Sequence, residues 1–186
     1  MFGLDESSPI KDCCFATNHC KIISFERELP VDNNDVLRRI RYVFDFNDSK
    51  MVDVFALADY SATREQIIEW LKKDDDPAFK KLDDTQMATF LNGLIVDKRG
   101  RKDGPLPMPE KRLTNNIVFI KLKIALDLKA EDILEILHLT DMDISKHELS
   151  AFFRKPDHKH YRECKDQILR NFLAGMQIKY RSSPNK

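Results

Sequence analysis

From residue 33 onward, apolar side chains recur every three or four positions, which is the period of an amphipathic α-helix. The segment that begins at Asn33 is the clearest case, because Val36, Ile40 and Val43 share one face of a helix. A half-buried β-strand would show strict alternation of apolar and polar residues, and this alternation does not dominate the sequence. We therefore predict an all-α fold with little or no sheet.

The chain also contains a long internal repeat. Sliding the sequence along itself by 82 positions aligns residues 33–100 (repeat 1) with residues 115–182 (repeat 2) without a gap. The identical or similar pairs include Asn33-Asn34 with Asn115-Asn116, Asp45 with Asp127, Ile40 with Leu122, Trp70 with Phe152, Phe90 with Phe172, and Gly93 with Gly175. This correspondence predicts a tandem duplication of one four-helix module.

Each repeat predicts four helices. The first begins at the asparagine pair, whose side chains can cap the opening turn, and the third begins at a capping box, Thr63 to Gln66 or Ser145 to Glu148. Asp76 followed by Pro77 predicts a helix start, with the aspartate as the cap. The expected ranges are about 33–46, 49–58, 63–73 and 84–98 in repeat 1, and about 115–128, 131–139, 145–155 and 161–180 in repeat 2.

Composition sets the limits of this organisation. The chain has 186 residues, of which 42% are hydrophobic, enough for a packed core. Residues 100–109 contain two glycines and three prolines, so residues 101–114 are predicted to form a linker between the repeats. Residues 1–32 form an extension outside the repeat, and residues 183–186 form a short tail.

Cysteine usage and hydropathy bear on the compartment. Three of the four cysteines, Cys13, Cys14 and Cys20, lie in the first twenty residues, where we expect them to react readily with thiol reagents. Cys164 replaces the apolar Leu82 of repeat 1, so we expect it to be buried. No pair of CxxC spacings predicts a metal or redox site, and no apolar run is long enough for a membrane span. We expect a cytoplasmic protein with no membrane contact and no cofactor.

Charge is balanced overall but unevenly distributed. Residues 1–32 carry −3, residues 33–100 carry −2 and residues 101–186 carry +5, so a polyanion would meet the C-terminal half first. The second and third helices of each repeat also resemble a helix-turn-helix, although the turn lacks the glycine often found there. We therefore predict a nucleic-acid contact in repeat 2, formed by Ser145, Lys146, Arg154, Lys155, Lys159, His160 and Arg162.

Other chemistry finds less support in the sequence. His158, His160 and Cys164 have a spacing that could hold a metal, but the repeat places Cys164 at a core position and no fourth ligand is evident. No catalytic triad, paired carboxylates or phosphate-binding glycine loop is present. We therefore expect a non-enzymatic binding or regulatory protein that contacts DNA or RNA. The alternative is a protein–protein adaptor or a homo-oligomer, which the neutral net charge favours.

Four segments carry a resemblance to a known family: NNDVLRRIRY, FLNGLIVDKRG, NNIVFIKLKIAL and ELSAFFRKPDHKHYRECKDQILRNFLAGM. In these segments the chain resembles the YehS-like proteins of bacteria, a duplicated domain family of unknown function (domain of unknown function 1456). The resemblance covers about residues 33–181 and implies an all-α bacterial cytoplasmic protein. It implies no catalytic residues.

Overall fold

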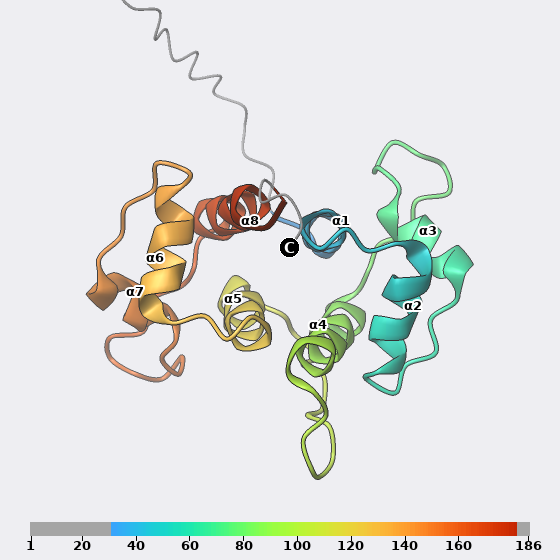
Figure 1. The fold of residues 1–186 in the computed structure, drawn as a ribbon, viewed down its shortest axis with the longest axis horizontal. Helices are drawn as coiled ribbons and strands as arrows, with labels where there is room; N and C mark the ends of the chain where they lie inside the picture. Colours follow the sequence, from blue (N-terminus) through green and yellow to red (C-terminus); the bar gives the residue numbers. More distant parts are fainter. Residues whose placement is uncertain (1–30, 182–186) are drawn as a thin grey trace, which may run out of the picture.

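The computed structural model describes residues 31–181, which contain eight helices and no strand (Figure 1). The helices of repeat 1 are α1 (Asn33–Val43), α2 (Asp48–Ala56), α3 (Arg64–Leu71) and α4 (Asp84–Arg99). Those of repeat 2 are α5 (Asn115–Ala125), α6 (Ala130–His138), α7 (Lys146–Phe152) and α8 (Asp166–Arg181). The all-α prediction is confirmed, and both repeats have the same helix order.

The turns repeat as faithfully as the helices. Asp45 and Asp127, just beyond α1 and α5, have φ angles of 52° and 54°, and Asp59 and Asp141, beyond α2 and α6, have 56° and 55°. Aspartate tolerates this left-handed conformation better than most residues, because its short side chain can hydrogen-bond locally. In the turn between α2 and α3, Asp59 thus adopts the left-handed conformation that a glycine often adopts in a helix-turn-helix.

The two repeats pack on each other around four central helices. Figure 1 shows α1, α4, α5 and α8 in the middle, with α2 and α3 on one side and α6 and α7 on the other. The main contacts between repeats are α4 with α5, which we call the linker seam, and α1 with α8, which we call the terminal seam. Because α5 corresponds to α1 and α8 to α4, the same pair of helices forms both seams, and the arrangement closes on itself.

Aromatic residues of both repeats lie in the core. Trp70, Phe90, Phe152 and Phe172 are at most 4% exposed, and Cys164 is buried, as the sequence predicts for this cysteine. In repeat 1 the ring of Phe55 lies 5.4 Å from that of Trp70 and 5.2 Å from that of Phe90, measured between ring centroids. No helix in residues 31–181 is long and apolar enough to cross a membrane.

The asparagine pairs do not cap the first helices, contrary to the sequence prediction. Asp32 and Thr114 are the N-caps of α1 and α5. Buried Asn34 instead donates to the carbonyl oxygens of Trp70 and Lys80, each at 2.9 Å, and accepts from the Leu82 amide at 2.9 Å. Its amide therefore links the end of α3 to the segment that precedes α4.

The same three bonds recur in repeat 2. Asn116 donates to the carbonyl oxygens of Phe152 and Arg162 and accepts from the Cys164 amide, each at 2.9 Å. Both loops between the third and fourth helices are thus held by one buried amide. A capping rule considers only residues close to the helix start, so it cannot predict hydrogen-bond partners more than thirty residues away in the sequence.

Several further helix boundaries differ from the prediction. The fourth helix of repeat 2 begins at Asp166 rather than near Tyr161, because the preceding residues form the loop that Asn116 holds. Asp76 does not start a helix; its carboxylate accepts from the Ala78 amide at 2.8 Å within a turn, and Asp83 caps α4. The first and third helices are shorter than predicted, and α7 ends at Phe152.

Candidate functional site

The structure divides the predicted nucleic-acid residues into two groups. Ser145 and Lys146 lie at the start of α7, and the other five lie in the loop of residues 153–165 between α7 and α8, which we call the basic loop. Since α7 has only seven residues, it spans about 10 Å. The two groups therefore lie at opposite ends of one short helix.

The groups at the start of α7 are already engaged. Ser145 and Glu148 form the predicted capping box: the hydroxyl accepts from the Glu148 amide at 3.2 Å, and the carboxylate accepts from the Ser145 amide at 3.0 Å. This bonding lowers the pKa of Glu148. Lys146 forms an ion pair with Glu131 of α6, with Nζ and Oε1 2.6 Å apart. The capping groups and the lysine at this end of α7 therefore already have hydrogen-bond or ion-pair partners within the protein.

The basic loop is anchored at its ends and exposed in its middle. Asn116 fixes the backbone at Phe152, Arg162 and Cys164, whereas Lys155, Pro156 and residues 157–160 are exposed. Within it, His158 Nδ1 accepts from the His160 amide at 3.1 Å, and the two imidazole rings lie 5.7 Å apart. The loop therefore presents a fixed backbone with cationic and imidazole side chains toward solvent.

In the corresponding loop of repeat 1, acids pair with Lys72 and Lys80, whereas exposed Lys73 and Lys81 have no acidic partner within 4 Å in the described residues. Lys72 pairs with Asp76 at 3.0 Å, Lys80 with Glu69 at 2.9 Å, and Arg38 of α1 with Asp74 at 3.9 Å. The residues that stand 82 positions after these three acids are His158 for Asp76, Ala151 for Glu69 and Pro156 for Asp74. Repeat 2 thus lacks every carboxylate that pairs with a cation around the loop of repeat 1.

Several cations of the basic loop are exposed and unpaired or weakly paired. Within residues 31–181, Lys155 and Lys159 have no acidic partner within 4 Å, and both side chains are exposed. Arg162 lies 3.7 Å from Glu148, an exposed pair of little energetic weight. Arg154 is half-buried, and its Nη1 atom is buried without a hydrogen-bond partner in the described chain. Lys155, Lys159 and Lys165 are therefore the cations of the loop without an acidic partner in the described residues, and Arg162 is only weakly paired.

The three residues with metal-ligand spacing do not share one environment. Cys164 is 1% exposed, and burial, together with the Asp166 and Glu163 carboxylates, raises the pKa of its thiol to about 12. His158 and His160 are exposed. In the part of the chain that the structure describes, no three His, Cys, Asp or Glu side chains are grouped to hold a metal ion.

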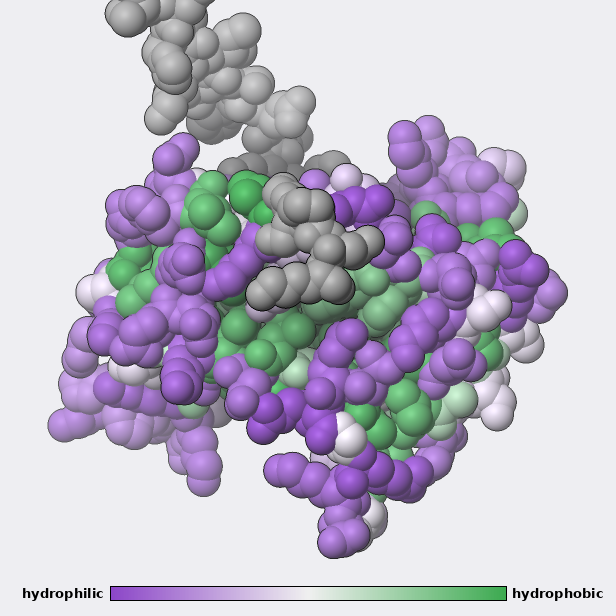
Figure 2. Space-filling model, in the orientation of Figure 1, coloured by the Kyte–Doolittle hydropathy of each residue, from purple (hydrophilic) through white to green (hydrophobic). Residues whose placement is uncertain are grey.

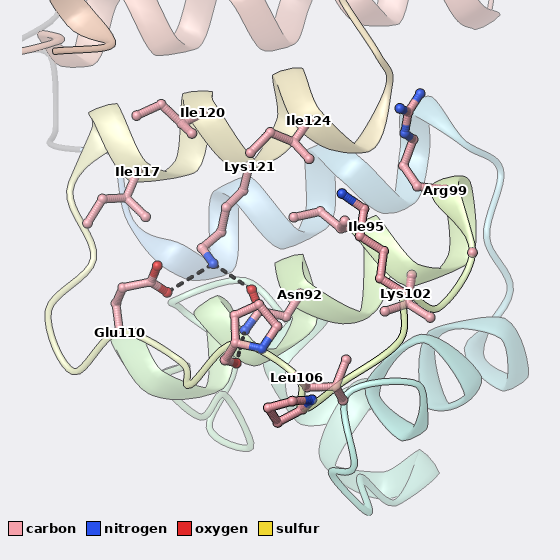
Figure 3. Close-up of a pocket in the computed structure, with 14 residues that line it drawn as sticks. Asn92, Ile95, Arg99, Lys102, Leu106, Glu110, Ile117, Ile120, Lys121 and Ile124 are labelled. Carbon is pink, nitrogen blue, oxygen red and sulfur yellow. Dashed lines mark hydrogen bonds and ion pairs between the residues drawn. The ribbon is translucent and has the colours of Figure 1, made fainter.

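Sequence reasoning missed a cavity of about 480 Å³ at the linker seam (Figure 3). It lies between α4, α5 and the linker, and Lys121 of α5 reaches toward Asn92 of α4 and Glu110 of the linker. Lys121 Nζ donates to Asn92 Oδ1 at 2.5 Å and lies 3.0 Å from Glu110 Oε2. Comparison of the two repeats could have drawn attention to this position, because buried Asn92 corresponds to Ala174 of repeat 2.

Comparison with known proteins gives the family. The family model described as "Protein of unknown function (DUF1456)" matches twice, at residues 33–100 and 115–182. The chain is 46% identical over 145 residues to the "Uncharacterized protein YehS" of Escherichia coli (strain K12), covering 77% of this chain and 93% of that protein. No solved structure matches the chain. The chain therefore belongs to the YehS-like family of DUF1456 proteins, in which the domain occurs as two tandem repeats.

Proposed function

We propose that the protein is a non-catalytic binding protein whose basic loop binds the phosphate backbone of DNA or RNA. We propose binding rather than catalysis because the sequence carries no catalytic motif. The observation that supports it is a difference between the two loops: Lys72 and Lys80 of repeat 1 are paired with acids, whereas the acids at the corresponding positions are absent from repeat 2, where Lys155 and Lys159 are exposed without an acidic partner.

The physical argument rests on counterion release. A lysine or arginine that meets a phosphate displaces a condensed counterion, and this gain drives sequence-independent binding. A cation already paired with a carboxylate must give up that partner first, so its gain is smaller. His158 and His160 stand beside these cations, and their exposed rings can stack on bases.

This mode of binding differs from insertion of a recognition helix. The start of α7 is occupied by its capping box and by the Lys146–Glu131 pair, so we place the contact in the loop rather than at Ser145 and Lys146. Contacts to the phosphate backbone position a protein on nucleic acid but do not distinguish one base sequence from another. The proposed function is therefore general binding to nucleic acid, with little sequence preference.

An adaptor or homo-oligomer is the alternative function. Such a function needs apolar surface that the packing of the two repeats leaves exposed, and the two seams bury much of the apolar surface within one chain. In the described residues six large apolar side chains remain exposed, and single ones are common on protein surfaces: Tyr42, Ile68, Met108, Ile124, Leu139 and Ile178. The binding experiment separates the two functions.

The test is binding of the full chain to labelled mixed-sequence duplex DNA and single-stranded RNA, from about 50 to about 300 mM salt. Affinity should fall linearly on a log–log plot, with a slope of roughly −0.9 per duplex phosphate contacted. The variant Lys155→Ala/Lys159→Ala/Arg162→Ala should bind all sequences more weakly and flatten the slope by about 2 to 3.

The matched control lies in repeat 1. Lys80→Ala/Lys81→Ala removes cations from the corresponding loop, one of them paired with Glu69, and should change affinity by less than the repeat 2 variant. Thermal melting of each variant checks that the fold is kept. Absence of salt-sensitive binding to any DNA or RNA at low ionic strength would reject the proposal and favour the adaptor.

A further inference from the structure

The linker-seam cavity has mainly apolar walls. Ile95 and Val96 of α4 face Ile117, Ile120 and Ile124 of α5, and Pro105, Leu106 and Pro107 of the linker close one side. The aliphatic side chains from α4 and α5 are half-buried or exposed rather than packed away from solvent. Figure 2 shows apolar surface over α4 and α5 in the middle of one face, surrounded by hydrophilic side chains. A volume of about 480 Å³ falls in the range of small-molecule sites.

One wall of the cavity carries a buried cation. The Lys121 side chain is only 8% exposed, and its ammonium contacts Asn92 and Glu110. An ammonium has three protons, so one proton has no acceptor in residues 31–181. The Asn92 amide in turn donates to the Pro107 carbonyl oxygen at 3.1 Å, which fixes its orientation. The cation is thus held in place with hydrogen-bonding capacity to spare.

The charges around the cavity are predominantly positive. Arg99, Lys102 and Lys121 line it against one carboxylate, that of Glu110. Arg99 is paired with Asp127 at 2.7 Å, but Lys102 is exposed and has no acidic partner in the described chain. A ligand that brings one negative charge would complement this set.

The terminal seam shows that the fold does not require these residues. There the same two helices meet, but the positions of Ile117, Ile120 and Lys121 are held by Asp35, Arg38 and Arg39. Arg39 pairs with Asp35 at 3.0 Å, so that face is polar and self-neutralised. An apolar cavity with a buried lysine is therefore specific to the linker seam and is not a by-product of joining two repeats.

We infer that the linker-seam cavity binds a small molecule with an apolar body and a carboxylate. The apolar body lies against the isoleucines of α5 and the linker prolines, and the carboxylate accepts a charge-assisted hydrogen bond from Lys121. Lys102, at the cavity lining, adds a second attraction. This site lies apart from the basic loop and goes beyond the proposed contact with nucleic acid.

The test uses three probes with the same chain and different head groups: decanoate, decanol and decylammonium. Full-length protein labelled at isoleucine methyl groups is titrated with each probe and followed by NMR. Decanoate should shift Ile95, Ile117, Ile120 and Ile124 saturably and leave the core residues Ile40 and Ile133 unchanged. It should bind about tenfold or more tightly than decanol, and decylammonium should bind most weakly.

Two variants locate the head group. Lys121→Met/Glu110→Gln removes the buried pair together, which avoids an orphaned carboxylate, and should weaken decanoate at least about tenfold while decanol changes less than about twofold. Arg39→Met, at the equivalent position of the terminal seam, should leave decanoate affinity unchanged. If the double variant fails to fold, Ile124→Trp at the exposed side of the cavity should block both decanoate and decanol.

Three results would overturn the inference. The first is that decanoate up to millimolar concentration shifts no seam methyl group, and the second is that its effect maps to Ile40 or Ile133. The third is that the three probes bind equally and that Lys121→Met/Glu110→Gln leaves their affinities unchanged. In each case Lys121 would serve only to tie the linker to the seam. Nucleic-acid binding by the basic loop, measured separately, would be unaffected.

Discussion

Gly93 of α4 packs so closely against Val54 of α2 that a β-carbon at residue 93 would overlap the Val54 carbonyl oxygen and lie 2.9 Å from its carbonyl carbon. The same relationship joins Gly175 of α8 to Ile136 of α6. A glycine inside a helix costs about 1 kcal/mol relative to alanine, so its presence here has a packing reason. In both repeats it lets the second helix touch the backbone of the fourth.

Alanine at either glycine should therefore destabilise the protein. Gly93→Ala or Gly175→Ala gains helix propensity but forces two helices apart, and we expect a net loss of about 1–3 kcal/mol in the free energy of unfolding. Chemical denaturation gives the value. Gln177→Ala, at a half-buried position of α8, is the control and should change stability by less than about 0.5 kcal/mol. Equal stability of Gly175→Ala and Gln177→Ala would refute the close packing.

Replacing a buried asparagine should also destabilise the protein. Asn34→Ala leaves two carbonyl oxygens and one amide unsatisfied, so we expect a loss of at least about 3 kcal/mol. Asn34→Asp should not rescue it, because an ionised carboxylate cannot donate to Trp70 or Lys80. Half-buried Asn33, replaced by alanine, should cost less. Asn34→Asp with wild-type stability at neutral pH would contradict the assigned bonds.

Much of the fold was predictable because the duplication tests every helix twice. A 3.6-residue period alone cannot separate a core position from a chance apolar residue, but its recurrence 82 residues later does, as with Phe90 and Phe172. What could not be predicted was the role of the asparagine pair and the start of α8. Both depend on the contacts of Asn34 and Asn116 with backbone far away in the sequence, which local capping rules do not include.

Cys164 should make stability depend on pH in the alkaline range. The folded protein raises the pKa of its thiol from 9.0 to about 12, so the unfolded chain loses this proton first as pH rises. The stability contributed by the protonated thiol is full below about pH 9 and is lost progressively toward pH 12. Urea denaturation from pH 8 to about pH 11 should show this decline.

Cys164→Leu, which installs the residue of repeat 1, is the control for that experiment and should show a smaller decline over the same range. The wild-type thiol should also react slowly with thiol reagents at pH 8 and rapidly in urea. Peptide mapping separates it from Cys13, Cys14 and Cys20, whose predicted fast reaction falls outside the described residues. Fast labelling of native Cys164 would mean that the core around it opens.

The candidate site was less predictable than the fold. Charge counting picked out the cluster of Arg154, Lys155, Lys159 and Arg162, but it could not show that Lys146 pairs with Glu131, because these residues meet only when α6 packs against α7. The linker-seam cavity was missed for the same reason, since α4 and α5 come from different repeats.

The most direct test of the role of the basic loop is to restore the acids that repeat 2 lacks. Pro156→Asp/His158→Asp places carboxylates at the exposed positions that Asp74 and Asp76 hold in repeat 1. The measurement is affinity for duplex DNA across the salt series, beside the reverse exchange Asp74→Pro/Asp76→His in repeat 1. We expect the first variant to lose most salt-sensitive binding with its melting temperature unchanged, and the second to bind more tightly than wild type. Wild-type affinity in both variants would contradict the assignment of the basic loop as the contact.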